Sequence, residues 1–205
     1  AGLGRWQLNN IFSAPQQIRT SFDLMSRENE RDWAHIAGRL ANVPGAIDGF
    51  IQTLEAARAE GKVSPRRQVQ IVIEQAEAYI ADGGFFDALA AEITAAAPAI
   101  TEQAREGTQA AKDGYRALIT YLRDTLLPEA PSKDAVGREL YTLYSRESLG
   151  ASIDLDETYA WGVQELERII TEQHTVASEI EPGASIERAK ELLDMDPVRA
   201  LHGTE

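Results

Sequence analysis

The stretch that decides the fold runs from Ala99 to Leu127 and reads AITEQAREGTQAAKDGYRALITYLRDTLL. Apolar and small side chains recur along it at the spacing of one helix face. They are Ala104, Ala111, Tyr115, Leu118, Leu122 and Leu126. A stripe that lasts for about seven turns is typical of a long helix with one side turned to a core. We therefore expect this helix to be the backbone of the fold.

Shorter helical patterns lie on both sides of this stretch, each bounded by cap-type residues, glycine or proline. They are predicted after Pro15, from Ser26 to Val43, from Pro44 to Gly61, from Ser64 to Asp82, from Phe85 to Ala97, from Ser132, from Asp154 to Ile180 and from Ser185 to Asp196. Pro44 is expected to end one helix and to open the next. No segment alternates with a period of two residues. The predicted fold class is all-α, an irregular multi-helix bundle of about eight or nine helices with no substantial sheet.

The helices are expected to form a single domain over residues 1–205. The pair Gly83-Gly84 predicts an internal hinge near residues 82–84. The chain opens on Ala1-Gly2 without an initiator methionine and ends just after a helix start. We therefore expect it to be a fragment of a longer protein.

Charge excludes two classes of partner. The 205 residues include 33 acidic and 20 basic ones, for a net charge of -13. Such a chain repels phosphate backbones and anionic lipids, so we expect no nucleic-acid and no membrane partner. No apolar run approaches the roughly 20 residues that span a bilayer. The compartment stays open, and a soluble, cytoplasmic protein is favoured.

The metal-binding candidates are few. The chain has no cysteine and three histidines. Asp32 and His35 share a helix face, but a di-metal bundle site needs a second pair of this kind, which is missing. His174 falls on an apolar stripe and is interpreted as a core histidine, and His202 lies near the end of the chain. No phosphate loop, Gly-x-Ser-x-Gly elbow or His-Glu-x-x-His motif occurs. We predict no catalytic and no metal-binding residue.

Acidic residues from Asp154 to Glu165 faintly resemble a calcium loop. The position that needs glycine is Tyr159, however, and the helical stripe continues through it. We interpret Asp154 as an N-cap, with acidic residues favoured by the helix dipole.

One cluster offers binding chemistry. Arg138, Tyr141 and Tyr144 supply donors for carbonyl and carboxylate groups, and we predict that they face a cleft. The alternative is ordinary packing, because leucines of the same helix, such as Leu140 and Leu143, are expected to lie in the core.

Several short motifs, taken in order, resemble one family. They are Val136-Gly137-Arg138-Glu139-Leu140-Tyr141, Asp156-Glu157, Gly162-x-x-Glu165-Leu166-x-x-Ile169, Arg39-Leu40-x-x-Val43-Pro44, Pro182-Gly183 and Asp196-Pro197. Together they resemble bacterial domain-of-unknown-function family 885, whose members look like zinc peptidases of the gluzincin group. The resemblance implies a helical middle portion that lacks the zinc-binding segment. Zinc is then expected only in the missing downstream part, with no cofactor in this chain.

Three functional hypotheses follow. The first is a non-catalytic helical scaffold and cleft wall of a zinc metallopeptidase-like protein, whose partners are the missing remainder of its polypeptide, a second copy through exposed apolar surface, and a peptide substrate. The second is an independent helical protein-interaction module, and the third is a self-sufficient metalloenzyme. The first predicts a large exposed apolar patch, whereas the second predicts a polar surface with one bounded groove. Whether the parent protein is an enzyme stays open.

Overall fold

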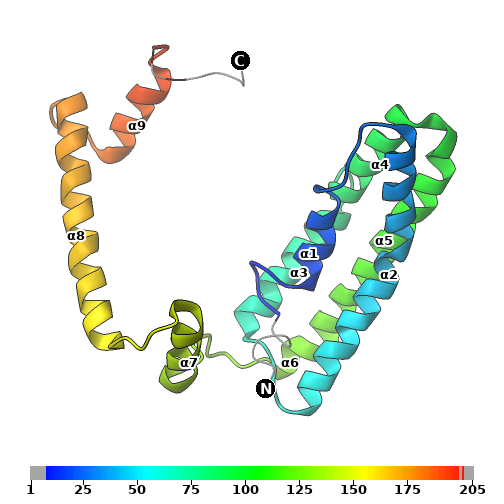
Figure 1. Cartoon of the computed structure of the whole chain (residues 1–205), viewed down its shortest axis with the longest axis horizontal. Helices are drawn as coiled ribbons and strands as arrows, with labels where there is room; N and C mark the ends of the chain where they lie inside the picture. The colour runs from blue at the N-terminus through cyan, green and yellow to red at the C-terminus, as the bar shows by residue number, and fades with distance from the viewer. Residues whose placement is uncertain (1–7, 199, 201–205) are drawn as a thin grey trace. The chain divides into compact units, whose positions relative to one another are not determined.

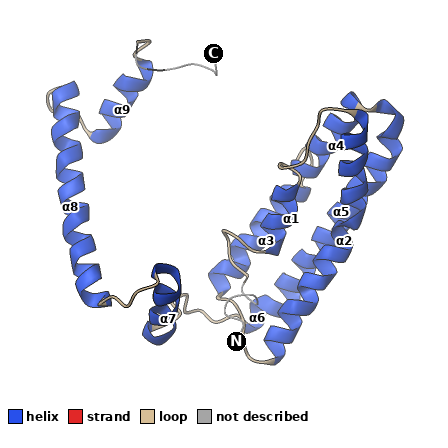
Figure 2. Ribbon diagram, viewed as in Figure 1, coloured by secondary structure: helices blue, strands red, loops and turns tan. Residues whose placement is uncertain are grey.

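A computed structural model describes residues 8–198 and residue 200, and all regular secondary structure in this part is helical (Figures 1 and 2). The contacts within the chain divide it into two compact units, residues 1–135 and 136–205. The first unit holds α1 (Ala14–Ser21), α2 (Glu30–Ala59), α3 (Arg66–Ile80), α4 (Phe85–Ala96), α5 (Thr101–Tyr121) and α6 (Leu127–Glu129). The second holds α7 (Arg138–Leu149), α8 (Leu155–Ile180) and α9 (Ile186–Met195). The all-α prediction is confirmed.

The number of helices is smaller than predicted. Within residues 8–198, seven helices have ten or more residues, instead of the expected eight or nine. One reason is Pro44, which lies inside α2 and does not break it. A proline in a helix interior costs about 3 kcal/mol. Buried side chains on both sides of it, including Val43 and Ile47, give α2 packing energy that outweighs this local cost.

The predicted hinge lies inside the first unit. Gly83 has a positive φ of 70° in the turn between α3 and α4. A Cβ at Gly84 would lie 2.6 Å from the carbonyl oxygen of Ala78, so this turn is packed against the end of α3. Hinge motion here, and one domain over residues 1–205, stay predictions.

The opening stretch forms the centre of the first unit, as predicted. All six residues of its stripe are buried, and α5 continues through a π-helical turn, Leu122–Leu126, into α6. α5 packs along α2, and two glycines set their separation. A Cβ at Gly107 would lie 2.9 Å from the carbonyl oxygen of Ala37, and one at Gly114 would lie 3.1 Å from the Cα of Pro44. We call this contact the glycine seam.

Tyr115, in an aromatic cluster, joins α5 to three other helices. The ring of Tyr115 lies 5.3 Å from that of Phe86 on α4 and 5.8 Å from that of Tyr79 on α3. Its buried hydroxyl donates a 2.6 Å hydrogen bond to the carbonyl oxygen of Pro15 on α1. Burial raises the pKa of Tyr115, so the hydroxyl remains a donor.

A polar network ties the end of α2 to α5 and α6. The Arg58 guanidinium donates to Glu55 at 2.8 Å through Nε and to Glu129 at 2.7 Å through Nη1. The Tyr121 hydroxyl donates to Glu55 Oε2 at 3.0 Å. The hydrogen bonds from Arg58, and then from Tyr121, lower the pKa of Glu55 to about 2.

In the second unit, caps and glycines define the helix ends. Asp154 caps α8 by accepting from the N–H groups of Asp156 and Glu157 at 2.9 and 3.0 Å, as predicted. Ser185 caps α9 in the same way. The helix expected to start at Ser132 starts at Arg138 instead, because Gly137 has a φ of 87°, which is incompatible with helix.

Candidate functional site

The helices of the second unit leave their apolar faces without partners inside that unit. Fourteen large apolar side chains between Val136 and Val198 are exposed, against three in residues 8–135. Ala177 and Ala189 are the buried apolar residues described in the unit. On α8, Tyr159, Trp161 and Leu166 are 76%, 63% and 57% exposed. We call the exposed apolar side chains of α7, α8 and α9 the apolar face.

This exposure corrects two predictions of core packing. Leu143 and Leu149 on α7 are more than half exposed. Val163 and Ile170 on α8, which lie on a stripe expected to face a core, are about two-fifths exposed. The helical period identifies which side chains share a face, but it does not identify the surface that covers them.

A groove lies between α8 and α9. It has a volume of about 260 Å³, and Ile169, Val176 and Ile180 of α8 face Ile186 and Leu193 of α9 across it. The buried Ala177 and Ala189 bring the two helices together because their side chains are small. The charged Glu172 and Lys190 also line the groove. Sequence reasoning missed this groove, although the apolar positions of both helices had been identified.

The residues predicted to face a cleft lie on α7. Arg138 begins the helix, and its Nη2 atom donates to Asp156 Oδ1 at 2.5 Å, which raises the pKa of Arg138. Tyr141 is 57% exposed and Tyr144 is half-buried. The groove between α8 and α9 is lined by other residues. A cleft-facing role for these three residues stays a prediction.

The histidines do not assemble a metal site in the described part of the chain. No group of three or more histidine, aspartate or glutamate side chains there could hold an ion. His35 is exposed on α2. His174 is exposed as well, which corrects its interpretation as a core histidine. His202 lies outside the described residues.

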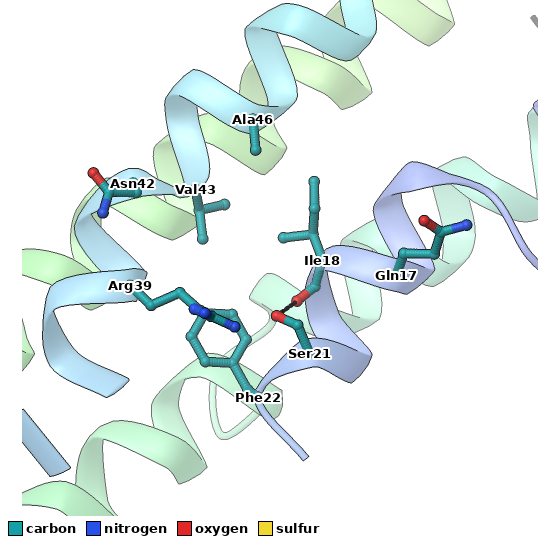
Figure 3. Close-up of a pocket in the computed structure, with 8 residues that line it drawn as sticks. All are labelled: Gln17, Ile18, Ser21, Phe22, Arg39, Asn42, Val43 and Ala46. Carbon is teal, nitrogen blue, oxygen red and sulfur yellow. Dashed lines mark hydrogen bonds between the residues drawn. The ribbon is translucent and has the colours of Figure 1, made fainter. Parts of the chain in front are cut away.

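A second hollow lies between α1 and α2, with a volume of about 320 Å³ (Figure 3). Ile18 and Val43 project into it, and Phe22 lines its base. The exposed Arg39 reaches toward α1 beside the hollow (Figure 3). The Ser21 hydroxyl donates a 2.7 Å hydrogen bond to the carbonyl oxygen of Ile18.

Among residues 8–198, no helix is long and apolar enough to cross a membrane.

A family model described as "Bacterial protein of unknown function (DUF885)" matches residues 1–205. No curated protein matches the chain.

Proposed function

Because the chain belongs to the bacterial family of unknown function DUF885, we propose that it is a non-catalytic helical scaffold that forms one wall of the substrate cleft in a zinc metallopeptidase-like protein. The observation that carries the proposal is the apolar face of α7, α8 and α9. A surface of this kind marks an interaction site when many apolar side chains are contiguous on it.

The energetics favour a permanent partner for this face. Covering a large apolar side chain is worth about 1.5–3 kcal/mol. Tyr159 and Leu166 lie two turns apart on the same side of α8 and are each more than half exposed, so these two alone would contribute several kcal/mol on docking. The proposed occupant is the remainder of the same polypeptide, which meets the face without the entropic cost of bimolecular association.

The proposed role is non-catalytic because the described side chains do not fit a catalytic zinc. Such a site needs about three protein ligands and an open position for water. No such ligand group occurs among residues 8–198. No step of hydrolysis is assigned to this chain, and the zinc of the proposed protein belongs to another segment.

Arg138, Tyr141 and Tyr144 are the proposed contribution of this chain to peptide binding. Arg138 retains N–H donors beyond the one that binds Asp156. Guanidinium and phenol groups on one helix can donate to the carbonyl and carboxylate oxygens of a peptide.

The test compares this chain with the longer polypeptide of its reading frame. Zinc content, peptide hydrolysis and acrylamide quenching of Trp161 fluorescence are measured for both, with a Trp161→Phe variant to isolate its signal. We expect no zinc and no hydrolysis from the chain alone, and protection of Trp161 in the longer polypeptide. One tightly bound zinc in the chain alone, or equal quenching of Trp161 in both proteins, would contradict the proposal.

The bounded groove between α8 and α9 favours a second function. An amphipathic helix could lay its apolar side between Val176 and Leu193, as helix-in-groove partners do. The chain would then be an independent protein-interaction module. A stable monomer that binds such a helix, with Trp161 still exposed in the longer polypeptide, would favour this function over the scaffold.

A further inference from the structure

One side of α8 has the residue spacing of a helix-packing surface. Five of its positions follow the alternating steps of four and three residues that are typical of packed helix pairs, and we call them the α8 seam. They are Leu155, Tyr159, Gly162, Leu166 and Ile169. Tyr159, Leu166 and Ile169 are 76%, 57% and 40% exposed. The α8 seam is therefore a packing surface that is largely open in the described part of the chain.

α9 covers only the C-terminal end of α8 (Figure 1). The groove between the two helices is lined by residues of α8 from Ile169 to Ile180. α9 has 10 residues and α8 has 26, so at about 1.5 Å per residue α9 can run along less than half of α8. The part of the α8 seam from Leu155 to Leu166 is therefore left for another partner.

Gly162 indicates how closely that partner approaches. The residue lies inside α8, where glycine weakens a helix, and large exposed apolar side chains precede and follow it along the α8 seam. A Cβ at Gly162 would meet nothing within 4 Å, so no described part of this chain needs glycine here. In the glycine seam, by contrast, Gly107 and Gly114 lie where the backbone of α2 comes close to α5. Gly162 is explained in the same way if a second helix backbone packs against it.

The charge of α8 disfavours a second copy of the chain as this partner. α8 contains six acidic residues and one basic residue, Arg168. The Arg168 guanidinium donates to both Glu165 and Glu172 at 2.8 Å, so one cation already serves two acids. Two α8 helices packed together would double the excess of negative charge. A helix of the same polypeptide need not carry these acids, and it meets α8 without the entropic cost of bimolecular association.

We propose, as a step that rests on the proposed function, that one helix of the remainder of the polypeptide packs along the α8 seam and crosses it at Gly162. The two backbones touch at Gly162, and a small residue of the docked helix faces it. Tyr159 and Leu166 pack on either side of the crossing.

The test is amide hydrogen exchange of residues 155–169, measured by mass spectrometry in this chain and in the longer polypeptide of its reading frame. In the chain alone, Gly162→Leu should slow exchange about threefold, because leucine favours helix and its Cβ meets nothing. In the longer polypeptide the same variant should speed exchange several-fold, because the leucine does not fit between two closely packed backbones.

Ala160→Leu is the matched control. Ala160 is exposed on α8, two residues from Gly162 and on the far side of the helix. This variant should leave exchange within about twofold of the wild type in both proteins.

The outcomes separate this proposal from the scaffold. If Trp161, which lies outside the α8 seam, is protected in the longer polypeptide but Gly162→Leu slows exchange in both proteins, the scaffold stands and the crossing at Gly162 is overturned. Equal quenching of Trp161 in both proteins contradicts the scaffold itself. A tight dimer of the chain alone, which protects residues 155–169 as strongly as the longer polypeptide does, would make a second copy the occupant and would also overturn the proposal.

Discussion

At the scale of single residues, Tyr115 holds the first unit together at the point where four helices meet. Its ring packs in the aromatic cluster, and its hydroxyl donates a hydrogen bond to the Pro15 carbonyl on α1. Nothing in the local sequence indicates this bond, because the two residues lie one hundred positions apart.

Tyr115→Phe should destabilise the protein by about 1 kcal/mol, because it removes the buried hydrogen bond between the Tyr115 hydroxyl and the Pro15 carbonyl. Urea unfolding followed by circular dichroism measures the change. Tyr141→Phe is the control, since Tyr141 is 57% exposed and its variant should stay within about 0.5 kcal/mol of the wild type. Equal stabilities of the two variants would show that the bond to Pro15 contributes nothing.

The lowered pKa of Glu55 predicts that the free energy of unfolding decreases at acid pH. Its pKa is lowered from 4.5 to about 2 in the folded state by the hydrogen bonds from Arg58 and Tyr121. A lowered folded-state pKa gives stability that is present above the unfolded pKa and is lost as the pH falls through the folded one. Stability should therefore decrease between about pH 4.5 and pH 2.

The measurement is the urea midpoint across this pH range. Glu55→Gln should show a shallower decrease than the wild type, because its amide does not titrate. Glu74→Gln, exposed on α3, is the control and should follow the wild type. The assignment to Glu55 fails if both variants show the same pH dependence.

At the scale of helices, the glycine seam sets how closely α2 and α5 approach. Ala at position 107 would gain about 1 kcal/mol in helix propensity. Its Cβ would also press on the carbonyl oxygen of Ala37 at 2.9 Å, and overpacking costs about 1–3 kcal/mol. The Cβ of Leu40 lies 3.0 Å away as well, and because it is bonded directly to the backbone it cannot move aside unless α2 shifts.

The overpacking cost exceeds the gain in propensity over most of its range, so we expect Gly107→Ala to destabilise the protein by up to about 2 kcal/mol. Gly45→Ala is the matched control on α2, because a Cβ there meets nothing within 4 Å. It should stabilise the protein by up to about 1 kcal/mol. Thermal and urea unfolding of both variants should show changes of opposite sign. If Gly107→Ala stabilises the protein, α2 and α5 can move apart at little cost, and the prediction is wrong.

The start of a helix could be predicted from the sequence wherever it depends on residues that are close together in the chain. Asp154 and Ser185 cap their helices as expected, because a cap bonds to amides two or three residues away. Pro44 was wrongly expected to end a helix, because the packing that carries α2 past it comes from distant residues. The hollow between α1 and α2 could not be predicted either, since it depends on how these two helices meet.

At the scale of the whole molecule, charge and apolar exposure are both concentrated in one part of the chain. Residues 136–205 hold fifteen acidic and six basic residues. The same segment carries the apolar face. Acidic repulsion therefore opposes the self-association that the apolar side chains favour.

We expect weak self-association that becomes stronger with salt, because ions screen the repulsion while the apolar contact remains. Sedimentation equilibrium at low and high ionic strength measures it. Leu166→Glu should weaken association about tenfold or more. Leu24→Glu, at a position 83% exposed in the first unit, should leave it unchanged. If the chain stays monomeric at high salt, the apolar face does not drive self-association.

The glycine seam also has a consequence for recognising distant members of this fold. The small residues at 104, 107, 111 and 114 face a proline-containing helix. They are needed for the close approach of two helix backbones, and not for binding or catalysis. A chain could replace every side chain around its hollows and still need this spacing. Searches that weight these positions should therefore detect relatives whose binding residues have diverged beyond recognition.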